Sequence, residues 1–207
     1  EPVNILYEDA FLIAAFKPPF LLVHDDGNSQ DTLQARINGY LQLNGNKYPA
    51  QAIHRIDYET SGLVLFCKHP FFQAYCDKNM EEHHIKKVYI ALVQGHTNYK
   101  NKKIVSNIAR DRHNAKKMII HPNGKESISI FNTLKNYKDY SLIQVTILTG
   151  RKHQIRVQCA SLKHPILNDS LYGGKRIDNT GLLLQSHHIQ FNDIDITCPQ
   201  EKRFIRK

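Results

Sequence analysis

The chain has 207 residues and a net charge of +9, from 28 lysines and arginines against 19 aspartates and glutamates. A hydrophobic share of 41% is enough for a buried core and excludes a disordered chain. The apolar runs are too short to cross a bilayer, and no secretory signal pattern opens the chain. We predict one domain over residues 1–207 that does not enter a membrane.

The first third of the chain combines strand and helix patterns. Residues 4–7 and 11–17 predict a β-hairpin, because an acidic turn separates two apolar runs. A helix with one apolar face is expected after Asp31, which is a favoured N-cap residue. The apolar run 62–68 predicts a buried strand, and Pro70 is typical of the first position of a second helix.

The rest of the chain reads mainly as strands. Apolar runs, one of them alternating with polar residues, predict strands at residues 88–94, 142–148 and 182–191. Residues 154–162 have the mixed spacing of a short helix. These patterns place one helix among several strands in this part of the chain.

A Pro-Asn-Gly sequence at residues 122–124 is a strong turn signal. It predicts a hairpin between residues 117–121 and 126–134. Strands outnumber helices, and hairpins join several of them. We therefore predict an α+β fold with a mixed, largely antiparallel sheet and flanking helices.

Positive charge is concentrated between Lys100 and Lys117, where seven cations and one anion account for six of the nine net charges. A solvated loop normally mixes signs, whereas a segment of one sign is typical of an arm that binds phosphates. From charge alone, both interpretations stay open. The expected RNA contacts in this segment are Arg110, Arg112, Lys116 and Lys117.

A dense polar segment at residues 54–62 precedes the predicted buried strand. Charges beside a core strand are costly unless each has a partner. Asp57 could cap a turn, but the density of polar groups favours a functional site. Its H-R-x-D string is like that of a protein kinase only superficially, because the kinase phosphate loop and D-F-G string are missing.

A second polar segment, at residues 149–156, follows a predicted strand and opens a predicted helix. Gly150 permits a tight turn that would leave Arg151 at the strand end, where a guanidinium can hold a carboxylate with two hydrogen bonds. The alternative is a helix start with surface arginines. Within residues 86–93, Tyr89 alone reads more simply as an ordinary strand tyrosine.

Cysteines and histidines give no sign of a metal site. No cysteine belongs to a C-x-x-C pair, and all lie in apolar or helical surroundings typical of free core thiols, which predicts a reducing, cytoplasmic compartment. Histidines lack partners at ligand spacing, and nucleotide-binding and zincin motifs are missing, so we expect neither metal nor cofactor. The cysteines are Cys67, Cys76, Cys159 and Cys198.

Four blocks of the chain resemble the RluA-type pseudouridine synthases, in the family order and over nearly its whole length. The blocks are residues 5–9 with 17–18 and 22–24, residues 54–57 with 60–63, residues 87–93, and residues 149–157 with 164–166, 169 and 172–173. The resemblance implies the pseudouridine synthase fold. It also implies isomerisation of a specific uridine in ribosomal or transfer RNA. The accessory N-terminal RNA-binding domain of some relatives is not expected in this chain.

The resemblance also implies residue roles. Asp57 matches the catalytic aspartate, and Arg151 matches the basic residue that pairs with it. Tyr89 matches the tyrosine that stacks on the target base and can take part in proton removal. Arg55 matches the arginine that enters the space left by the flipped nucleotide, and Leu184 matches an apolar residue of the base pocket.

The chemistry of the reaction agrees with these roles. A carbon–nitrogen glycosidic bond breaks, and the same sugar carbon joins a ring carbon of the base. The Asp57 carboxylate can attack the sugar carbon or remove a sugar proton to give a glycal, and both routes stay open. The base must first leave the stack, and an aromatic face such as Tyr89 can hold it. Lys87 is a further expected RNA contact.

Departures from the family pattern affect the substrate more than the reaction. For example, Gln185 and Ser186 stand where the family usually has His-Ala.

Two other functions stay open: a non-catalytic RNA-binding protein on the same fold, and a nucleic-acid glycosidase. Because Asp57, Tyr89 and Arg151 are all present, we expect an enzyme. Its expected partner is RNA, and its expected state is a cytoplasmic monomer.

Overall fold

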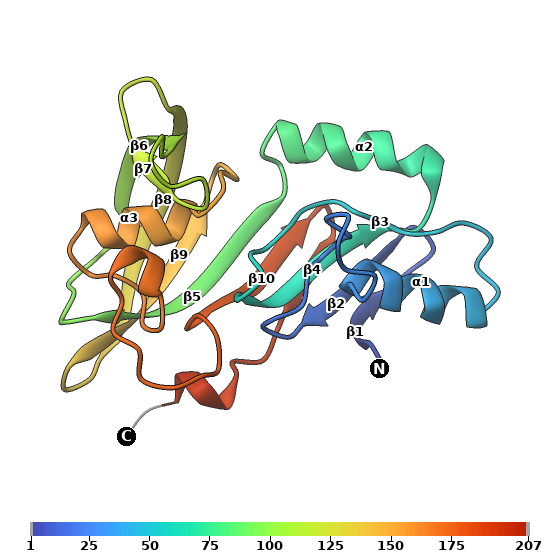
Figure 1. Cartoon of the computed structure of the whole chain (residues 1–207). Helices are drawn as coiled ribbons and strands as arrows, with labels where there is room; N and C mark the ends of the chain where they lie inside the picture. The colour runs from blue at the N-terminus through green and yellow to red at the C-terminus, as the bar shows by residue number, and fades with distance from the viewer. Residues whose placement is uncertain (1, 206–207) are drawn as a thin grey trace. The chain divides into compact units, whose positions relative to one another are not determined.

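The structure is a computed structural model that describes residues 2–205 (Figure 1). Glu1, Arg206 and Lys207 lie outside the described residues. By its internal contacts the chain divides into two compact units. Within the described residues, unit 1 comprises residues 2–85 and 186–199, and unit 2 comprises residues 86–185 and 200–205. The expectation of one domain over the whole chain stays a prediction.

Unit 1 is a sheet with the strand order β1-β2-β4-β10, in which β3 lies beside β4 and β11 beside β10. Strands β1 and β2 form the antiparallel hairpin that the sequence predicts. The elements are β1 (Asn4–Glu8), β2 (Leu12–Lys17), α1 (Leu33–Leu43), β3 (Gln51–Ala52), β4 (Ser61–Cys67), α2 (Pro70–Glu81), β10 (Leu184–Phe191) and β11 (Ile194–Thr197).

Helix α1 begins one residue later than its sequence indicates. Thr32, rather than Asp31, is the N-cap, and its hydroxyl accepts a hydrogen bond from the Ala35 amide at 3.1 Å. Asp31 instead forms an ion pair with Arg36 at 2.7 Å. Both residue types are good caps, so a pattern places this boundary only to within a residue or two. Helix α2 begins at Pro70, as predicted.

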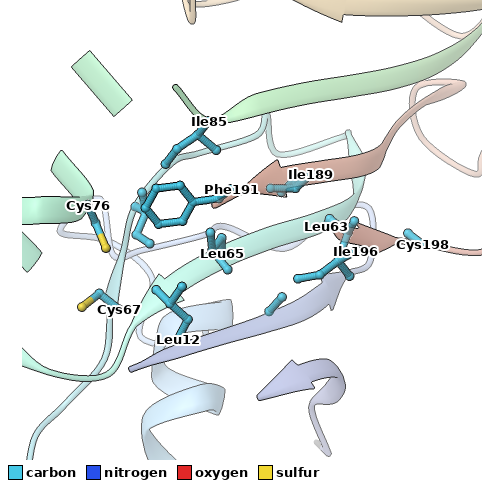
Figure 2. Packing of buried hydrophobic residues seen from close by; sticks show 12 residues of the cluster. Leu12, Leu63, Leu65, Cys67, Cys76, Ile85, Ile189, Phe191, Ile196 and Cys198 are labelled. Atoms are coloured by element: carbon cyan, nitrogen blue, oxygen red, sulfur yellow. The ribbon is translucent and has the colours of Figure 1, made fainter. Parts of the chain in front are cut away.

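The central strand β4 is buried along its whole length because both of its faces are covered. Leu63 and Leu65 belong to the core on the α2 side, which Figure 2 shows together with Phe191. Val64 and Phe66 belong to a second core, to which α1 contributes its apolar face. Full burial of one such side chain contributes about 1.5–3 kcal/mol to stability. The predicted buried strand at residues 62–68 is therefore confirmed.

Unit 2 contains a sheet with the order β5-β9-β8-β6-β7, and every neighbouring pair in it is antiparallel. Together with unit 1 it gives the α+β class and the mostly antiparallel pairing that the sequence predicts. The elements are β5 (Lys86–Gln94), β6 (Lys102–Arg110), β7 (Met118–Ile120), β8 (Lys125–Asn136), β9 (Tyr140–Ile147), α3 (Gln154–Ser161) and the short 3-10 helices η1 (Ser170–Tyr172) and η2 (Lys202–Phe204).

The predicted hairpin around residues 122–124 is wrong. Strands β7 and β8 do not pair with each other, because β6 lies between them and pairs with both. The turn itself is real, since the Gly124 amide donates to the His121 carbonyl at 2.8 Å. It carries the chain across β6 instead of reversing it alongside a neighbour. The tight hairpin is formed by β6 and β7 around the loop 111–117, and the sequence pattern did not reveal β6 as a strand.

Gly124 is needed at this crossing because the chain passes close to the backbone of β6. A Cβ atom at Gly124 would lie 2.6 Å from the Ile108 carbonyl carbon and 2.7 Å from that of Asn107. Contacts this short with backbone atoms cannot be relieved by turning a side chain. The Asn107 carbonyl also accepts a hydrogen bond from the His121 amide at 2.9 Å, which holds the crossing segment in place.

Two further properties concern the whole described chain. The four cysteines are all free and buried, as expected for core thiols. Within residues 2–205, no helix is long and apolar enough to cross a membrane.

Replacement of Gly124 by alanine should lower the free energy of unfolding by about 1–3 kcal/mol, since the new methyl group collides with the β6 backbone. Urea denaturation of the full chain measures this change. Gly39→Ala is the matched control. Gly39 lies within α1 with nothing inside 4 Å of its Cβ position, so alanine there should stabilise the protein by up to about 1 kcal/mol. A Gly124→Ala protein as stable as the wild type would contradict the crossing.

Candidate functional site

Asp57 lies in unit 1, in the loop that joins β3 to β4. The residue is half-buried, and buried Thr60 and Ser61 follow it. The Thr60 amide donates to the Asp57 carbonyl at 3.0 Å and closes a turn. The turn considered as an alternative for this segment is thus present, and the main chain of Asp57 makes it.

A buried lysine holds this loop. Lys17, at the end of β2, has no exposed surface. Its ammonium group donates to the carbonyls of Pro18 at 2.9 Å, Leu21 at 2.7 Å and Tyr58 at 3.1 Å. A buried ammonium is costly unless its three donors meet acceptors, and here three carbonyls lie within reach. Because Tyr58 directly follows Asp57, Lys17 fixes the backbone on which the predicted catalytic residue stands.

The two residues before Ile56 have different environments. His54 is buried, and its Nε2 accepts a hydrogen bond from the Leu65 amide at 3.2 Å, which joins the loop to β4. Arg55 is exposed, and its guanidinium lies 3.4 Å from Nε2 of His24. Exposure is compatible with the role that the resemblance gives to Arg55, and that role stays a prediction.

Lys87 and Tyr89 lie two residues apart on β5 in unit 2, so their side chains share one face of the sheet. Both residues are buried, with 5% and 6% of their surface exposed. Burial lowers the pKa of Lys87 to about 8, because the charged ammonium loses its hydration. Lys87 therefore differs from the surface lysines expected to contact RNA.

Arg151 follows β9, and the amide side chain of Gln154 fixes the turn that carries it. The Gln154 oxygen accepts hydrogen bonds from the Thr149 hydroxyl at 2.8 Å and the Arg151 amide at 3.0 Å. Its NH₂ group donates to the Ile128 carbonyl at 3.1 Å and the Ser129 hydroxyl at 2.8 Å. Every donor and acceptor of this buried amide is used.

The register of the sheet connects this turn to the two β5 residues. Ser129 on β8 stands opposite Ile147 on β9, which stands opposite Lys87. Residues directly opposite each other share a face, so Lys87 lies on the same side of the sheet as Gln154. Unit 2 thus gathers Lys87, Tyr89 and the Arg151 turn on one face. The Nε of Arg151 itself donates to the Glu126 carbonyl at 3.1 Å.

Leu184, at the first position of β10, is 4% exposed. The first two residues of β10, Leu184 and Gln185, belong to unit 2, and the rest of the strand belongs to unit 1. The role of Leu184 in a base pocket stays a prediction. Sequence reasoning missed the positioning roles of Lys17 and Gln154. Both residues belong to segments that resemble the family, but neither spacing nor composition indicates which carbonyls or amides a buried polar group will contact.

The predicted phosphate-binding residues lie on the β6–β7 hairpin. Arg110, Arg112 and Lys116 are exposed, and Lys117 is half-buried. The loop between the strands is internally bonded: the Asp111 amide donates to the Lys117 carbonyl at 3.0 Å, and Arg110 Nε donates to the Ala115 carbonyl at 3.2 Å. The basic segment is therefore a folded hairpin, called the basic hairpin below (residues 102–120).

Comparisons with known proteins agree with these motifs. The RNA pseudouridylate synthase family matches residues 12–161. An uncharacterized RNA pseudouridine synthase of Bacillus subtilis is 35% identical over 175 residues, which is 83% of this chain and 58% of that protein. The ribosomal large subunit pseudouridine synthase C of Buchnera aphidicola is 35% identical over 222 residues, 97% of this chain and 68% of that protein. The chain therefore belongs to the RNA pseudouridylate synthase family.

Other relatives extend this result. The ribosomal large subunit pseudouridine synthase D of Borreliella burgdorferi is 32% identical over 99% of this chain and 64% of its own length. The chain thus spans about three fifths of the length of the first relatives it matches. The solved structure of human RNA pseudouridylate synthase domain containing 1 has a TM-score of 0.80 at 22% identity, over 99% of this chain and 85% of that one, and confirms the fold.

Lys17→Met should lower the free energy of unfolding by about 2–4 kcal/mol, because it leaves buried carbonyls without their donor. Chemical denaturation measures the change. Lys47→Met removes the same charge from an exposed position and should change stability by less than about 0.5 kcal/mol. Equal stability of the two variants would show that Lys17 does not hold the Asp57 loop.

Proposed function

We propose that this chain isomerises uridine to pseudouridine in RNA. The observation that carries the proposal is the face of unit 2 on which Lys87, Tyr89 and the Arg151 turn are gathered, in a family member that also has Asp57 in a fixed loop. A buried aromatic ring can hold the flipped base of a target nucleotide, and an arginine on a fixed turn can supply a positive charge beside it.

In the proposed reaction, Asp57 supplies the ionised carboxylate that breaks the glycosidic bond. It does so by attacking the sugar carbon or by removing a sugar proton. Arg151 supplies the positive charge that favours the ionised form of the carboxylate. The released uracil turns over on the face of Tyr89, and its ring carbon C5 bonds to the same sugar carbon. This step breaks the Asp57 ester in the first route, or returns the removed proton to the sugar in the second. Tyr89 takes part in removing the proton from C5, and N1 ends protonated, so no atom is gained or lost. Leu184 lines the apolar side of the pocket. Nothing in this sequence of steps needs a redox group or a group donor.

RNA is the proposed partner, and the basic hairpin is its proposed backbone site. Phosphate binding by lysine and arginine is independent of sequence, so the hairpin orients the RNA while the pocket selects a uridine. Arg55 is proposed to fill the space left by the flipped nucleotide. Buried Lys87 is proposed to act beside Tyr89, inside the pocket, because surface phosphates do not reach a side chain that is 5% exposed.

Ribosomal RNA is the first substrate to test, because relatives at 32–35% identity are named for the large ribosomal subunit. Transfer RNA is the second. The decisive experiment maps pseudouridine in both RNAs from cells with and without the gene. A site that disappears in the mutant, and that the purified protein restores in vitro, supports the proposal. Release of free uracil would point to a glycosidase, and RNA binding without any product to a non-catalytic protein. We further propose that the chain acts as one catalytic domain, as a monomer and in the cytoplasm.

Asp57→Asn should lower kcat at least about a thousandfold and change the Kd for RNA less than about threefold, because the lost charge serves the chemical step. Quantification of pseudouridine by chromatography after digestion of the RNA measures the first effect. Asp77→Asn, an exposed substitution on α2, is the matched control and should leave turnover intact. Near-normal turnover of Asp57→Asn would assign the carboxylate role elsewhere.

Replacing Lys116 and Lys117 together by alanine should weaken RNA binding and reduce the slope of log Kd against log salt by about 1.4–1.8, the contribution of two phosphates. Fluorescence anisotropy with a labelled RNA stem–loop at several salt concentrations measures the slope. The pair Lys47→Ala and Lys78→Ala removes the same net charge from exposed positions in unit 1 and should leave the slope nearly unchanged. Equal slopes in the two double variants would show that the basic hairpin does not bind RNA phosphates and is an ordinary solvated surface.

A further inference from the structure

One tyrosine hydroxyl connects three segments of unit 2 that are far apart in the sequence. The Met118 amide donates to Oη of Tyr172 at 2.8 Å, and Nδ1 of His153 lies 2.9 Å from the same oxygen. Met118 is the first residue of β7, Tyr172 is the last residue of η1, and His153 is the N-cap of α3. Because Oη accepts from Met118, its own proton can be donated to Nδ1 of neutral His153.

The Met118 amide is the natural point at which to anchor the basic hairpin. Strand β7 has only three residues and lies at the edge of its sheet, so β6 is its one neighbouring strand. An edge strand this short is weakly held by its ladder. The hydrogen bond to Tyr172 gives β7 a second attachment, directly after the loop that carries Lys116 and Lys117.

The Tyr172 ring is itself held firmly. It is 9% exposed and packs in a small core with Ile108 and Val157. The guanidinium of Arg156 lies over its face at 5.1 Å and forms an ion pair with buried Asp169 at 2.8 Å. This fixed ring can therefore hold α3 and the basic hairpin at a constant separation.

His153 brings the link to the Arg151 turn. Its backbone is left-handed, with φ 55° and ψ 21°, and its ring meets the Tyr172 ring edge to face at 5.7 Å. Only one residue separates it from Arg151. The Lys117 ammonium lies 5.7 Å from the centroid of the same Tyr172 ring. The Tyr172 ring thus contacts Lys117, a predicted phosphate-binding residue, and His153, which lies two residues after the predicted catalytic Arg151.

We propose that Tyr172 and His153 are positioning residues, which hold the basic hairpin at a fixed place relative to the Arg151 turn so that a bound RNA backbone is in register with the catalytic face. This inference rests on the proposed function, since it takes RNA as the ligand of the hairpin. Neither residue touches the reacting atoms. Their contribution is to RNA affinity and to the number of phosphates neutralised.

Tyr172→Phe tests the proposal in the full chain, because it removes Oη and keeps the ring in its core. We expect the Kd for a labelled RNA stem–loop to rise about three- to tenfold, the range for one lost hydrogen bond, and the slope of log Kd against log salt to fall by about 0.7–0.9 or more. KM should rise, and kcat should stay within about twofold of the wild-type value. A merely structural role would lower the thermal midpoint and leave the salt slope unchanged.

Tyr99→Phe is the matched control. Tyr99 is also a buried tyrosine of unit 2 that meets a histidine ring edge to face, that of His164 at 6.2 Å. Its ring likewise contacts a lysine of the basic hairpin, Lys102 at 5.0 Å, but within the described residues no hydrogen bond joins its hydroxyl to the hairpin. Tyr99→Phe should leave the slope unchanged. His153→Asn keeps a residue type that tolerates left-handed backbone and shortens the side chain. Combined with Tyr172→Phe, it should add little to the loss of affinity, because both changes break one link.

The outcomes separate this inference from the proposed function. If the wild type forms pseudouridine and Tyr172→Phe keeps its Kd and salt slope, the link is overturned and the function stands. If the wild type binds the stem–loop, forms no pseudouridine in any RNA, and Tyr172→Phe lowers the slope, the function is overturned and the link stands. If turnover is present and the slope falls, both are supported.

Discussion

The arrangement of the predicted catalytic residues depends on buried polar side chains that form hydrogen bonds with the backbone of the loops. In unit 2, Gln154 uses both lone pairs and both protons of its amide to join β8 to the Arg151 turn. In unit 1, Lys17 gives its ammonium protons to two carbonyls of the segment after β2 and to the Tyr58 carbonyl in the Asp57 loop. A buried polar group that lost such partners would be costly, so each loop has one favourable conformation. Loops held in this way have the rigidity of the sheet although they are not part of it.

Much of the fold could be predicted from the sequence, because burial imposes a period on the residues. The fully buried β4 appears as a continuous apolar run, and Pro70 marks the start of α2. The sequence does not indicate strand β6, because most of its residues are polar or charged. A largely exposed strand beside a short edge strand can carry such residues. The prediction of a hairpin at residues 122–124 is wrong for a physical reason. A turn sequence indicates that the chain bends, but it does not indicate which strand the chain pairs with afterwards.

The candidate site was predictable to a different degree. Asp57, Tyr89 and Arg151 were identified by motif, and the structure adds the reason why Tyr89 and the Arg151 turn share one face, which is the register of β5, β9 and β8. The supporting contacts were not predictable. Tyr172 reaches a backbone amide 54 residues away in the chain, and no periodicity reports such a pairing. Long-range hydrogen bonds are set by packing, so they become visible only in three dimensions.

The crossing at Gly124 has a consequence for motion. Because β6 is held along Lys102–Ile108 by β8, on the side away from β7, the outer strand and its loop can open without separating β6 from the sheet. Opening then breaks the short β7 ladder, the Tyr172 bond and the contact of Lys117 with the Tyr172 ring. Such local openings need far less free energy than global unfolding. The sheet that supports the proposed catalytic face stays intact when the outer strand opens.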